Sequence, residues 1–162
     1  MYFGCFVVVI RQATAEDIVE ISQLAYEVLP ERYSSGVFSS FFERFPEGLW
    51  VAMENARVVG FLIGVMPGVG SARVLMLGVV PGCRKQGVGT GLLAAFRAAL
   101  EPFHVLSIHL EVLTTNEAAL AFYRKNGFEI QERMKKFYVT GEDAFLMRKS
   151  LKSLSARVPS PS

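Results

Sequence analysis

The sequence has only two cysteines, almost no net charge and no long apolar run, and each shortage excludes a class of protein. Cys5 and Cys83 stand far apart and outside any CxxC spacing, so neither a disulfide framework nor a zinc site is indicated. A formal net charge of +2 over 162 residues is too small to suggest a nucleic-acid-binding protein. We therefore expect no metal, no nucleic-acid partner and a reducing, cytoplasmic location.

The two ends of the chain carry no sign of a membrane segment. The apolar start, residues 1–10, lacks the basic residues of a secretory leader and is much shorter than a membrane span, so its Val and Ile residues predict a strand. A length of 162 residues predicts one domain, over residues 1–150. The hydrophobic fraction of 51% is compatible with a monomer or with a homodimer that covers an apolar face. Residues 151–162, rich in Ser and Pro, are predicted to be a flexible tail.

Hydrophobic spacing divides the rest of the chain into helices and strands. Because a strand precedes the glycine-rich turn and its helix, and another strand follows, these two strands are predicted to be parallel. The fold class is therefore α+β, a mixed sheet in which antiparallel strands lead into a parallel pair, with helices on both faces. The predicted strands cover residues 49–54, 58–66, 72–80, 105–113, 128–139 and 143–148, and the predicted helices run through residues 18–28, 38–45, 92–100 and 116–126.

The stretch from Leu77 to Leu93 joins an apolar strand, a basic glycine-rich turn and an amphipathic helix. The first N–H groups of a helix have no partner within the helix, the helix dipole places partial positive charge there, and glycine lets a phosphate approach the backbone. Arg84 and Lys85 add full charges at the same place. The stretch therefore predicts a site for a phosphate-bearing ligand.

Two common phosphate-binding patterns do not fit this turn. Gly82 and Gly87 have the separation of a P-loop, but Val88-Gly89 stands where that motif needs Lys followed by Ser or Thr. A dinucleotide fingerprint would need a third glycine at Leu92. What remains is either a plain strand-to-helix turn with surface charges or the order Arg-x-x-Gly-x-Gly, which resembles the pyrophosphate loop of the GNAT acyl-CoA N-acyltransferases.

A second motif follows in the order that this family has. Asn116 is predicted to cap a helix, and Tyr123, seven residues later and roughly 10 Å along the axis, returns to nearly the same side. This stripe resembles the second GNAT signature, which follows the pantetheine arm. Leu-Pro-Glu-Arg-Tyr at residues 29–33 resembles the connector of Ard-type protein N-terminal acetyltransferases, and residues 136–147 resemble the ending of RimI-type enzymes.

The resemblance implies a GNAT-type sheet of six to seven strands, mostly antiparallel and splayed at its central parallel pair, with about four helices. It implies an acetyl-CoA-dependent N-acetyltransferase that acts on the α-amino group of a protein or peptide, with acetyl-CoA as cosubstrate. It also leaves room for association with the ribosome or a ribosomal protein. The alternatives are a GNAT that acetylates small amines, such as polyamines, amino acids or aminoglycosides, and an acyl-CoA-binding module without catalysis.

Amide formation from a thioester needs a neutral amine, stabilisation of the developing oxyanion and a proton for the departing thiolate. An α-amine with a pKa near 8 is about a tenth neutral at pH 7, so a weak or water-mediated base suffices. By the resemblance, Tyr123 is the general acid and Glu111 or Glu31 the base. Each of the three residues also has a purely structural interpretation. Tyr123 would then be a packed aromatic ring, Glu111 a solvated carboxylate on a strand, and Glu31 an exposed turn residue. Arg73 stands near a place where some relatives have a catalytic Tyr or His.

The remaining expected contacts follow the same resemblance. Backbone N–H groups at Gly78-Val79 would hold the oxyanion. The cosubstrate contacts are expected at Leu77, Gly78, Val79, Arg84, Lys85, Gln86, Gly87, Val88, Gly89, Thr90, Asn116 and Tyr123. The peptide slot is expected at Leu29, Pro30, Glu31, Tyr33, Phe137 and Tyr138, although ordinary packing would also account for the apolar and aromatic members of this set.

Overall fold

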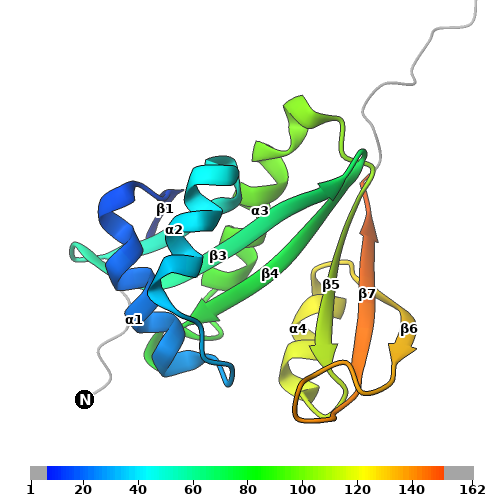
Figure 1. Cartoon of the computed structure of the whole chain (residues 1–162). Coiled ribbons are helices and arrows are strands. Elements are labelled where there is room, and N and C mark those ends of the chain that lie inside the picture. Colours follow the sequence, from blue (N-terminus) through cyan, green and yellow to red (C-terminus); the bar gives the residue numbers. More distant parts are fainter. Residues whose placement is uncertain (1–6, 152–162) are drawn as a thin grey trace, which may run out of the picture.

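The computed structural model describes residues 7–151, in which seven strands form one mixed sheet with the order β1-β2-β3-β4-β5-β7-β6 (Figure 1). Only β4 and β5 pair in parallel, which confirms the predicted fold class and the parallel pair. The strands are β1 Val9–Gln12, β2 Leu49–Glu54, β3 Arg57–Gly68, β4 Ser71–Val79, β5 Ser107–Leu113, β6 Glu129–Met134 and β7 Ala144–Ser150. The helices are α1 Ile18–Val28, α2 Ser35–Arg44, α3 Val88–Ala99 and α4 Glu117–Lys125.

Two strands have other bounds than the sequence-based prediction gave them. The first strand runs from Val9 to Gln12 instead of lying within residues 1–10, and residues 1–6 are outside the described part of the chain. The strand predicted for 128–139 ends at Met134 because the following residues turn back toward β7. Residues 152–162, most of the predicted tail, are also outside the described residues.

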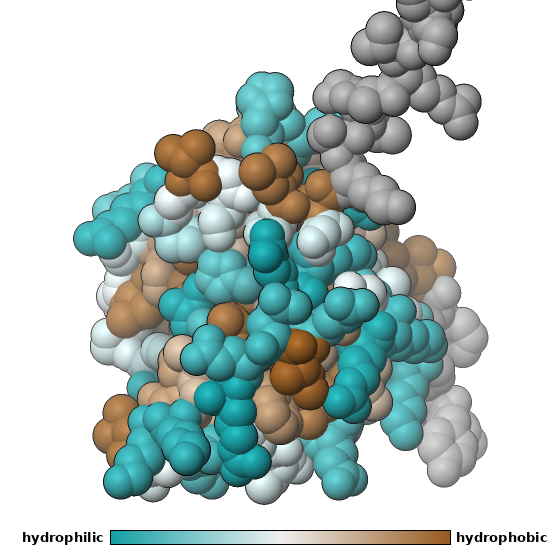
Figure 2. Space-filling model, turned by 90° about the vertical axis from the view of Figure 1, so that its right-hand side faces the viewer, coloured by the Kyte–Doolittle hydropathy of each residue, from teal (hydrophilic) through white to brown (hydrophobic). Residues whose placement is uncertain are grey.

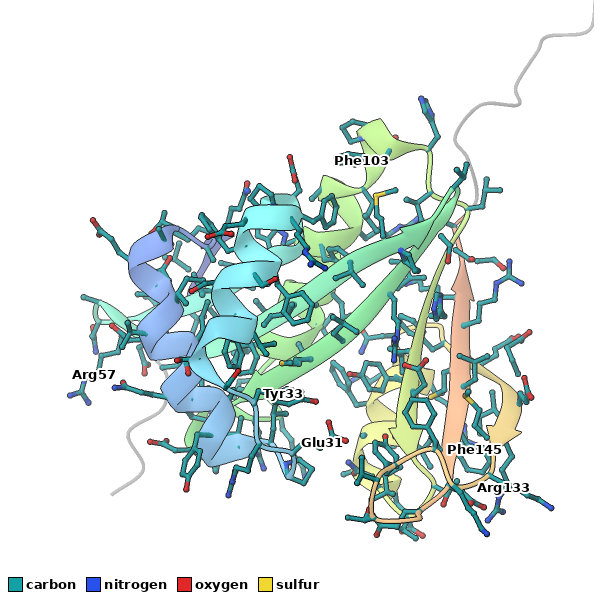
Figure 3. All side chains as sticks on the ribbon, viewed as in Figure 1. Glu31, Tyr33, Arg57, Phe103, Arg133 and Phe145 are labelled. Atoms are coloured by element: carbon teal, nitrogen blue, oxygen red, sulfur yellow. The ribbon has the colours of Figure 1, made fainter. Side chains whose placement is uncertain are left out.

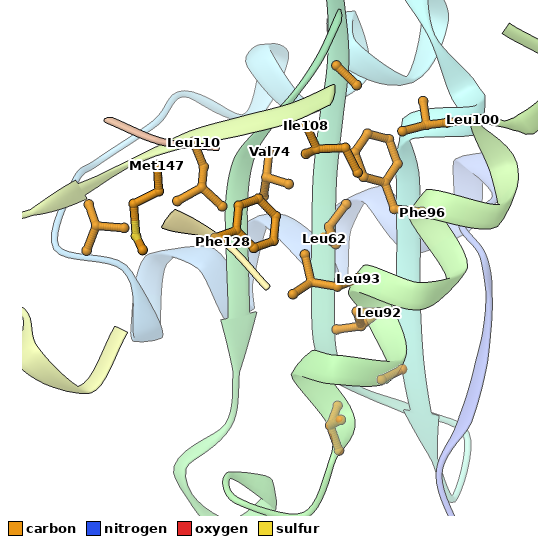
Figure 4. Close-up of a cluster of buried hydrophobic side chains, with 14 of the residues drawn as sticks. Leu62, Val74, Leu92, Leu93, Phe96, Leu100, Ile108, Leu110, Phe128 and Met147 are labelled. Carbon is orange, nitrogen blue, oxygen red and sulfur yellow. The ribbon is translucent and has the colours of Figure 1, made fainter. Parts of the chain in front are cut away.

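The helices cover the two faces of the sheet in pairs. On one face α1 and α2 pack with β2, β3 and β4 around a buried group that includes Ile21, Leu24, Phe38 and Phe61. On the other face α3 and α4 share a larger core, which includes Leu120 of α4. Figure 4 labels other members of this core, among them Leu92, Phe96, Leu110, Phe128 and Met147. Because both faces of β3 and β4 are covered, β3 is buried along most of its length.

The parallel pair separates soon after it begins. β4 and β5 pair only at Ser71↔Ser107, Ala72↔Ile108 and Arg73↔His109, although β4 continues to Val79 and β5 to Leu113. The register of β4 against β3 shifts between Val74 and Met76, so that Leu75 is an extra residue. A bulge of this kind bends a strand and increases its twist. The two strands therefore diverge into a V that opens toward the turn leading to α3 (Figure 1).

The two outer regions of the sheet have different surfaces. The edge strand β6 exposes Glu129, Gln131, Glu132 and Arg133, and Figure 2 shows mainly hydrophilic side chains on this side of the molecule. Charged side chains on an edge strand oppose pairing with another sheet. Within residues 7–151 no helix has both the length and the apolar character that a membrane crossing requires.

Cys83 departs from the expectation of a reduced chain. It is buried in the 3-10 turn η3, Pro81–Cys83, and is disulfide-bonded, so the sequence-based prediction is wrong for this residue. The other cysteine, Cys5, lies outside the described residues. Two cysteines so far apart in the chain give no spacing from which a bond can be predicted.

Candidate active site

The V between β4 and β5 brings backbone groups of β4 to an unpaired edge. The Val80 N–H donates to the Val59 carbonyl on β3 at 2.9 Å. Since N–H groups of a strand alternate between its two edges, the N–H groups of Leu77 and Val79 point away from β3, into the V. The N–H of Gly78 points toward β3. A Cβ on Gly78 would lie 2.7 Å from both Phe61 and Val28, so this glycine allows β3, β4 and α1 to pack closely.

The turn after β4 places the predicted basic residues beside the start of α3. Arg84, Lys85 and Gln86 are exposed in this turn. The Arg84 Nε donates to the Val79 carbonyl at 2.9 Å, and the Gln86 amide donates to the Gly82 carbonyl at 3.2 Å. Arg84 is therefore held against the open edge of β4 while its charge remains exposed.

The first turn of α3 presents unpaired backbone donors. The first backbone bond of the helix is from the Gly91 N–H to the Gly87 carbonyl, so the N–H groups of Val88, Gly89 and Thr90 have no partner within the helix. Gly87 is the N-cap, with φ of 82°, and a Cβ there would meet nothing within 4 Å. The left-handed backbone conformation at position 87 favours glycine, and the open space beside this residue can receive an anion.

Gly89 has a different role from Gly87. A Cβ on Gly89 would lie 2.9 Å from the ring of Phe122 on α4. This glycine therefore allows α3 and α4 to approach each other, a contact that the sequence pattern did not indicate. Within one motif, Gly87 thus allows the left-handed backbone conformation, and Gly89 allows the close packing of two helices.

The second motif folds as expected. The Asn116 Oδ1 accepts a hydrogen bond from the Ala119 N–H at 3.1 Å, which confirms Asn116 as the N-cap of α4. Tyr123 lies between Phe122 and Phe128, at centroid distances of 5.1 and 5.6 Å. Burial and the nearby Tyr138 raise the pKa of the Tyr123 hydroxyl, so it stays protonated well above neutral pH.

A polar row crosses the opposite face of the V. Ala72, Val74, Ile108, Leu110 and Val112 belong to the core under α3 and α4. By strand alternation, their neighbours Ser71, Arg73, His109 and Glu111 face the other side, where α1 and α2 lie. Ser71 Oγ is 3.3 Å from His109 Nδ1. Burial lowers the pKa of His109. The charges of Arg73 and Arg148 lower it further, and the charge of Glu111 raises it by less than this total. His109 is therefore neutral at pH 7.

An ion pair joins the two diverging strands. The Arg73 Nε and Nη2 both donate to Glu111 Oε2, at 2.9 and 2.8 Å. The Glu111 side chain is 12% exposed and that of Arg73 is 32% exposed. Glu111, one of the two carboxylates predicted as the base, is therefore held in an ion pair by Arg73.

The connector between α1 and α2 supplies the second carboxylate. Leu29, Pro30, Glu31 and Tyr33 all lie in it, and the Tyr33 hydroxyl donates to Glu31 Oε2. Burial, followed by Glu31, raises the pKa of Tyr33. Figure 3 shows Glu31 and Tyr33 on the side of the connector that faces β5.

Phe137 and Tyr138 lie in the loop between β6 and β7, opposite the connector. Asp143 holds this loop, because its carboxylate accepts from the Lys136 N–H and the Arg133 Nε, both at 2.9 Å. The Asp143 carbonyl accepts from the Thr114 N–H at 3.2 Å, which ties the loop to the β5–α4 turn. Lys136 has a φ of 51°, a conformation that side chains disfavour and that the bond to Asp143 supports.

Tyr138 joins the groups of the site electrostatically. Burial raises its pKa first, and the charges of Glu31 and Glu111 raise it further, while Arg73 lowers it. Tyr138 also raises the pKa of Tyr123 on the other side of the V. Tyr138 is therefore near enough to both predicted carboxylates to be affected by them, and near enough to Tyr123 to affect it.

Sequence reasoning missed three features of this arrangement, namely the Arg73–Glu111 pair, the Glu31–Tyr33 bond and the role of Asp143. Glu31 and Tyr33 stand two residues apart, and that spacing was an available signal. The other two features depend on strand register. Within the described residues, no group of three or more His, Cys, Asp or Glu side chains is arranged to bind a metal.

The mixed sheet with its splayed parallel pair and the turn before α3 together have the architecture of an acyltransferase. The sequence matches the family model described as Acetyltransferase (GNAT) family over residues 15–128. The chain belongs to this family and is an acetyl-CoA-dependent N-acetyltransferase.

Individual relatives share most of the chain. The N-terminal acetyltransferase A complex catalytic subunit NAA10 of Arabidopsis thaliana is 32% identical over 151 residues, covering 90% of this chain and 79% of the relative. An N-alpha-acetyltransferase of Sulfolobus acidocaldarius is 31% identical over 153 residues, covering 85% and 89%. The crystal structure of Ard1 from Thermoplasma volcanium superposes with a TM-score of 0.85 at 30% identity, covering 90% of this chain and 99% of that one.

Proposed function

We propose that the protein transfers acetyl from acetyl-CoA to the α-amino group of protein or peptide N-termini. The observation that carries the proposal is the V between β4 and β5, which has helix N–H groups and Tyr123 on one side and two carboxylates on the other. Relatives named as N-alpha-acetyltransferases support it, as does a solved Arabidopsis thaliana Naa50 complex with the bisubstrate analogue CoA-Ac-MVNAL, which is 25% identical with a TM-score of 0.78.

Acetyl-CoA supplies an acetyl group activated as a thioester. The N–H groups of Val88, Gly89 and Thr90 would receive its pyrophosphate, with the charges of Arg84 and Lys85 beside them. The Asn116 Oδ1 is already engaged in capping α4, so its amide NH2 is the group available to the pantetheine. The open space at Gly87 and the unpaired helix donors fit this ligand.

The catalytic roles follow from the two sides of the V. Glu31 or Glu111 would accept the proton of the attacking amine, directly or through water. The N–H of Val79, which points into the V, would donate to the developing oxyanion; of the two donors expected at Gly78-Val79, only this one has the required direction. The Tyr123 hydroxyl would give its proton to the departing thiolate. Leu29, Pro30, Tyr33, Phe137 and Tyr138 would line the peptide slot.

A peptide library that varies the first two residues tests the proposed substrate. Acetylation is measured with acetyl-CoA, and free polyamines and peptides with an internal lysine serve as competitors. We expect turnover on the α-amines and little on the competitors, because only a group with a pKa near 8 is about a tenth neutral at pH 7. Fast turnover of polyamines with none of the peptides would replace this proposal with the small-amine alternative.

The two carboxylates can be separated by their isosteric amides. Glu31→Gln leaves Tyr33 a hydrogen-bond acceptor, and Glu111→Gln leaves one for Arg73, so both variants keep the local packing. We expect Glu31→Gln to have the larger effect on kcat/KM, about tenfold or more, because Glu111 is already engaged with a cation. The acidic limb of the pH profile should disappear with the carboxylate that acts as base.

Other properties of the chain are also proposals. We expect a single domain over residues 1–150, a monomer or homodimer, and a cytoplasmic enzyme that meets its substrates at or near the ribosome. Fractionation of cells that express the tagged full chain, followed by sedimentation with and without ribosomes, tests both location and association.

A further inference from the structure

Arg73 lies at the point where the V opens, on the acceptor side of the sheet. It is the last residue of β4 that pairs with β5, and its side chain is 32% exposed although it reaches Glu111. A cation at this position has no part in the proposed transfer, whose amine is attracted by carboxylates. Its presence in the slot needs a separate explanation.

The guanidinium uses only one of its two hydrogen-bonding edges. Within the described residues, its bonds go from Nε and Nη2 to the single oxygen Oε2 of Glu111. Arginine carries five N–H donors in a planar fork and binds carboxylates bidentately. The edge formed by Nη1 and Nη2 therefore remains available to a second carboxylate.

Arg73 is close to both rims of the proposed peptide slot. Its charge lowers the pKa of both Tyr33, on the α1–α2 connector, and Tyr138, on the β6–β7 loop, which are the two rims of the slot. Arg148 acts with Arg73 on the neutral His109. The carboxylates of Glu31, Glu111 and Glu142 act on the pKa of Tyr138 in the opposite direction to Arg73.

We propose that Arg73 makes the slot selective for peptides with an aspartate or glutamate among their first two residues. This inference rests on the proposed function. The α-amine would approach Glu31, while the substrate carboxylate, a few bonds away along the same peptide, would bind the open edge of Arg73. Glu111 then holds the guanidinium side-on, so that the open edge is oriented before the peptide arrives.

Isosteric peptide pairs test the proposal. Peptides with Asp or Asn, and Glu or Gln, at the first or second position differ in charge and little in shape. For the wild type we expect about a tenfold higher kcat/KM for the acid of the preferred pair, mainly through KM, because a charge-assisted bidentate contact is lost with the amide. The preference should fall as salt is raised.

Substitutions locate the effect. Arg73→Gln should reduce the acid-to-amide ratio to about one, and the double variant Arg73→Gln/Glu111→Gln should do the same without leaving the mostly buried Glu111 carboxylate unpaired. Glu111→Gln alone should raise the ratio, since it removes a negative charge beside the open edge while its amide oxygen can still accept from Arg73. Arg148→Gln is the matched control: it removes the same charge from the next strand, opposite His109, and should change the ratio less than twofold.

The outcomes separate this inference from the proposed function. Equal turnover of acidic and amide peptides by the wild type, or an unchanged ratio in both Arg73 variants, would overturn the role of Arg73 and leave N-terminal acetylation intact. If no peptide is acetylated while acetyl-CoA still binds, the proposed function itself fails. Circular dichroism of each variant confirms that the ratios come from folded protein.

Discussion

The two sides of the V present different chemical groups: mainly backbone N–H groups on one side and polar side chains on the other. On the donor side, the groups that would meet the cosubstrate are backbone N–H groups of β4 and α3, and the surrounding side chains form a continuous apolar core. On the acceptor side, a row of polar side chains is joined by hydrogen bonds and an ion pair. Backbone groups keep their position whatever side chain they carry, whereas one substitution changes a side-chain site. The donor side is therefore suited to one invariant ligand, and the acceptor side to a choice among substrates.

The largest expected effect comes from removing the one donor-side side chain that would take part in the chemistry. Tyr123→Phe should lower kcat about a hundredfold with little change in either KM, because a general acid contributes roughly 10²–10⁴ in rate. Tyr26→Phe, on the exposed face of α1, is the control and should have no effect. Wild-type kcat should show no alkaline loss from this acid up to about pH 10, since burial raises the pKa of Tyr123. Unchanged turnover in a Tyr123→Phe variant that binds CoA would remove the assigned acid.

An intermediate effect is expected where the donor side depends on backbone conformation. Gly87→Val should raise the KM for acetyl-CoA about tenfold and leave the peptide KM unchanged, because a residue with φ of 82° is strained by roughly 1–2 kcal/mol when it carries a side chain. Gly82→Val is the matched control. A Cβ on Gly82 also meets nothing within 4 Å, but the backbone of Gly82 is not left-handed, so this variant should bind acetyl-CoA normally. Isothermal titration with CoA distinguishes lost binding from lost turnover. If both variants bind equally well, the loop does not hold the pyrophosphate.

A smaller effect is expected from the acceptor-side loop. Asp143→Asn weakens the contacts to Arg133 and to the Lys136 N–H, so it should raise the peptide KM a few-fold, roughly the loss of one hydrogen bond, and leave the acetyl-CoA KM unchanged. The Lys136 N–H and Arg133 lower the pKa of Asp143, so its contribution is fully present above the ordinary carboxyl pKa near 4 and is lost as the pH falls below it.

Asp17→Asn is the control for Asp143→Asn. Asp17 also accepts from an arginine and a backbone N–H, those of Arg11 and Thr14, but it lies at the start of α1, away from the β6–β7 loop. Its peptide KM should equal that of the wild type after correction for any unfolded fraction. A change in acetyl-CoA KM with Asp143→Asn would show that the two sides of the V are less independent than their construction indicates.

Much of the donor side could be predicted because it is contiguous in the sequence. The turn from Arg84 to Thr90 and the helix from Asn116 to Tyr123 each fold on local rules, a left-handed glycine before one helix and an asparagine cap before the other. The acceptor side resisted prediction because Arg73, Glu111 and Tyr138 come from β4, β5 and a distant loop. Only strand register decides that Arg73 meets Glu111.

The sequence by itself determined the order of the elements, the parallel pair and the glycine-rich turn that begins α3, because hydrophobic period, glycine and capping residues act over a few neighbouring positions. The tertiary structure decided how far β4 and β5 separate, which N–H groups point into the V, and that Gly89 packs against Phe122. It also decided that one predicted base is bound to an arginine. These features depend on a bulge and on contacts between residues far apart in the chain, which no local pattern records.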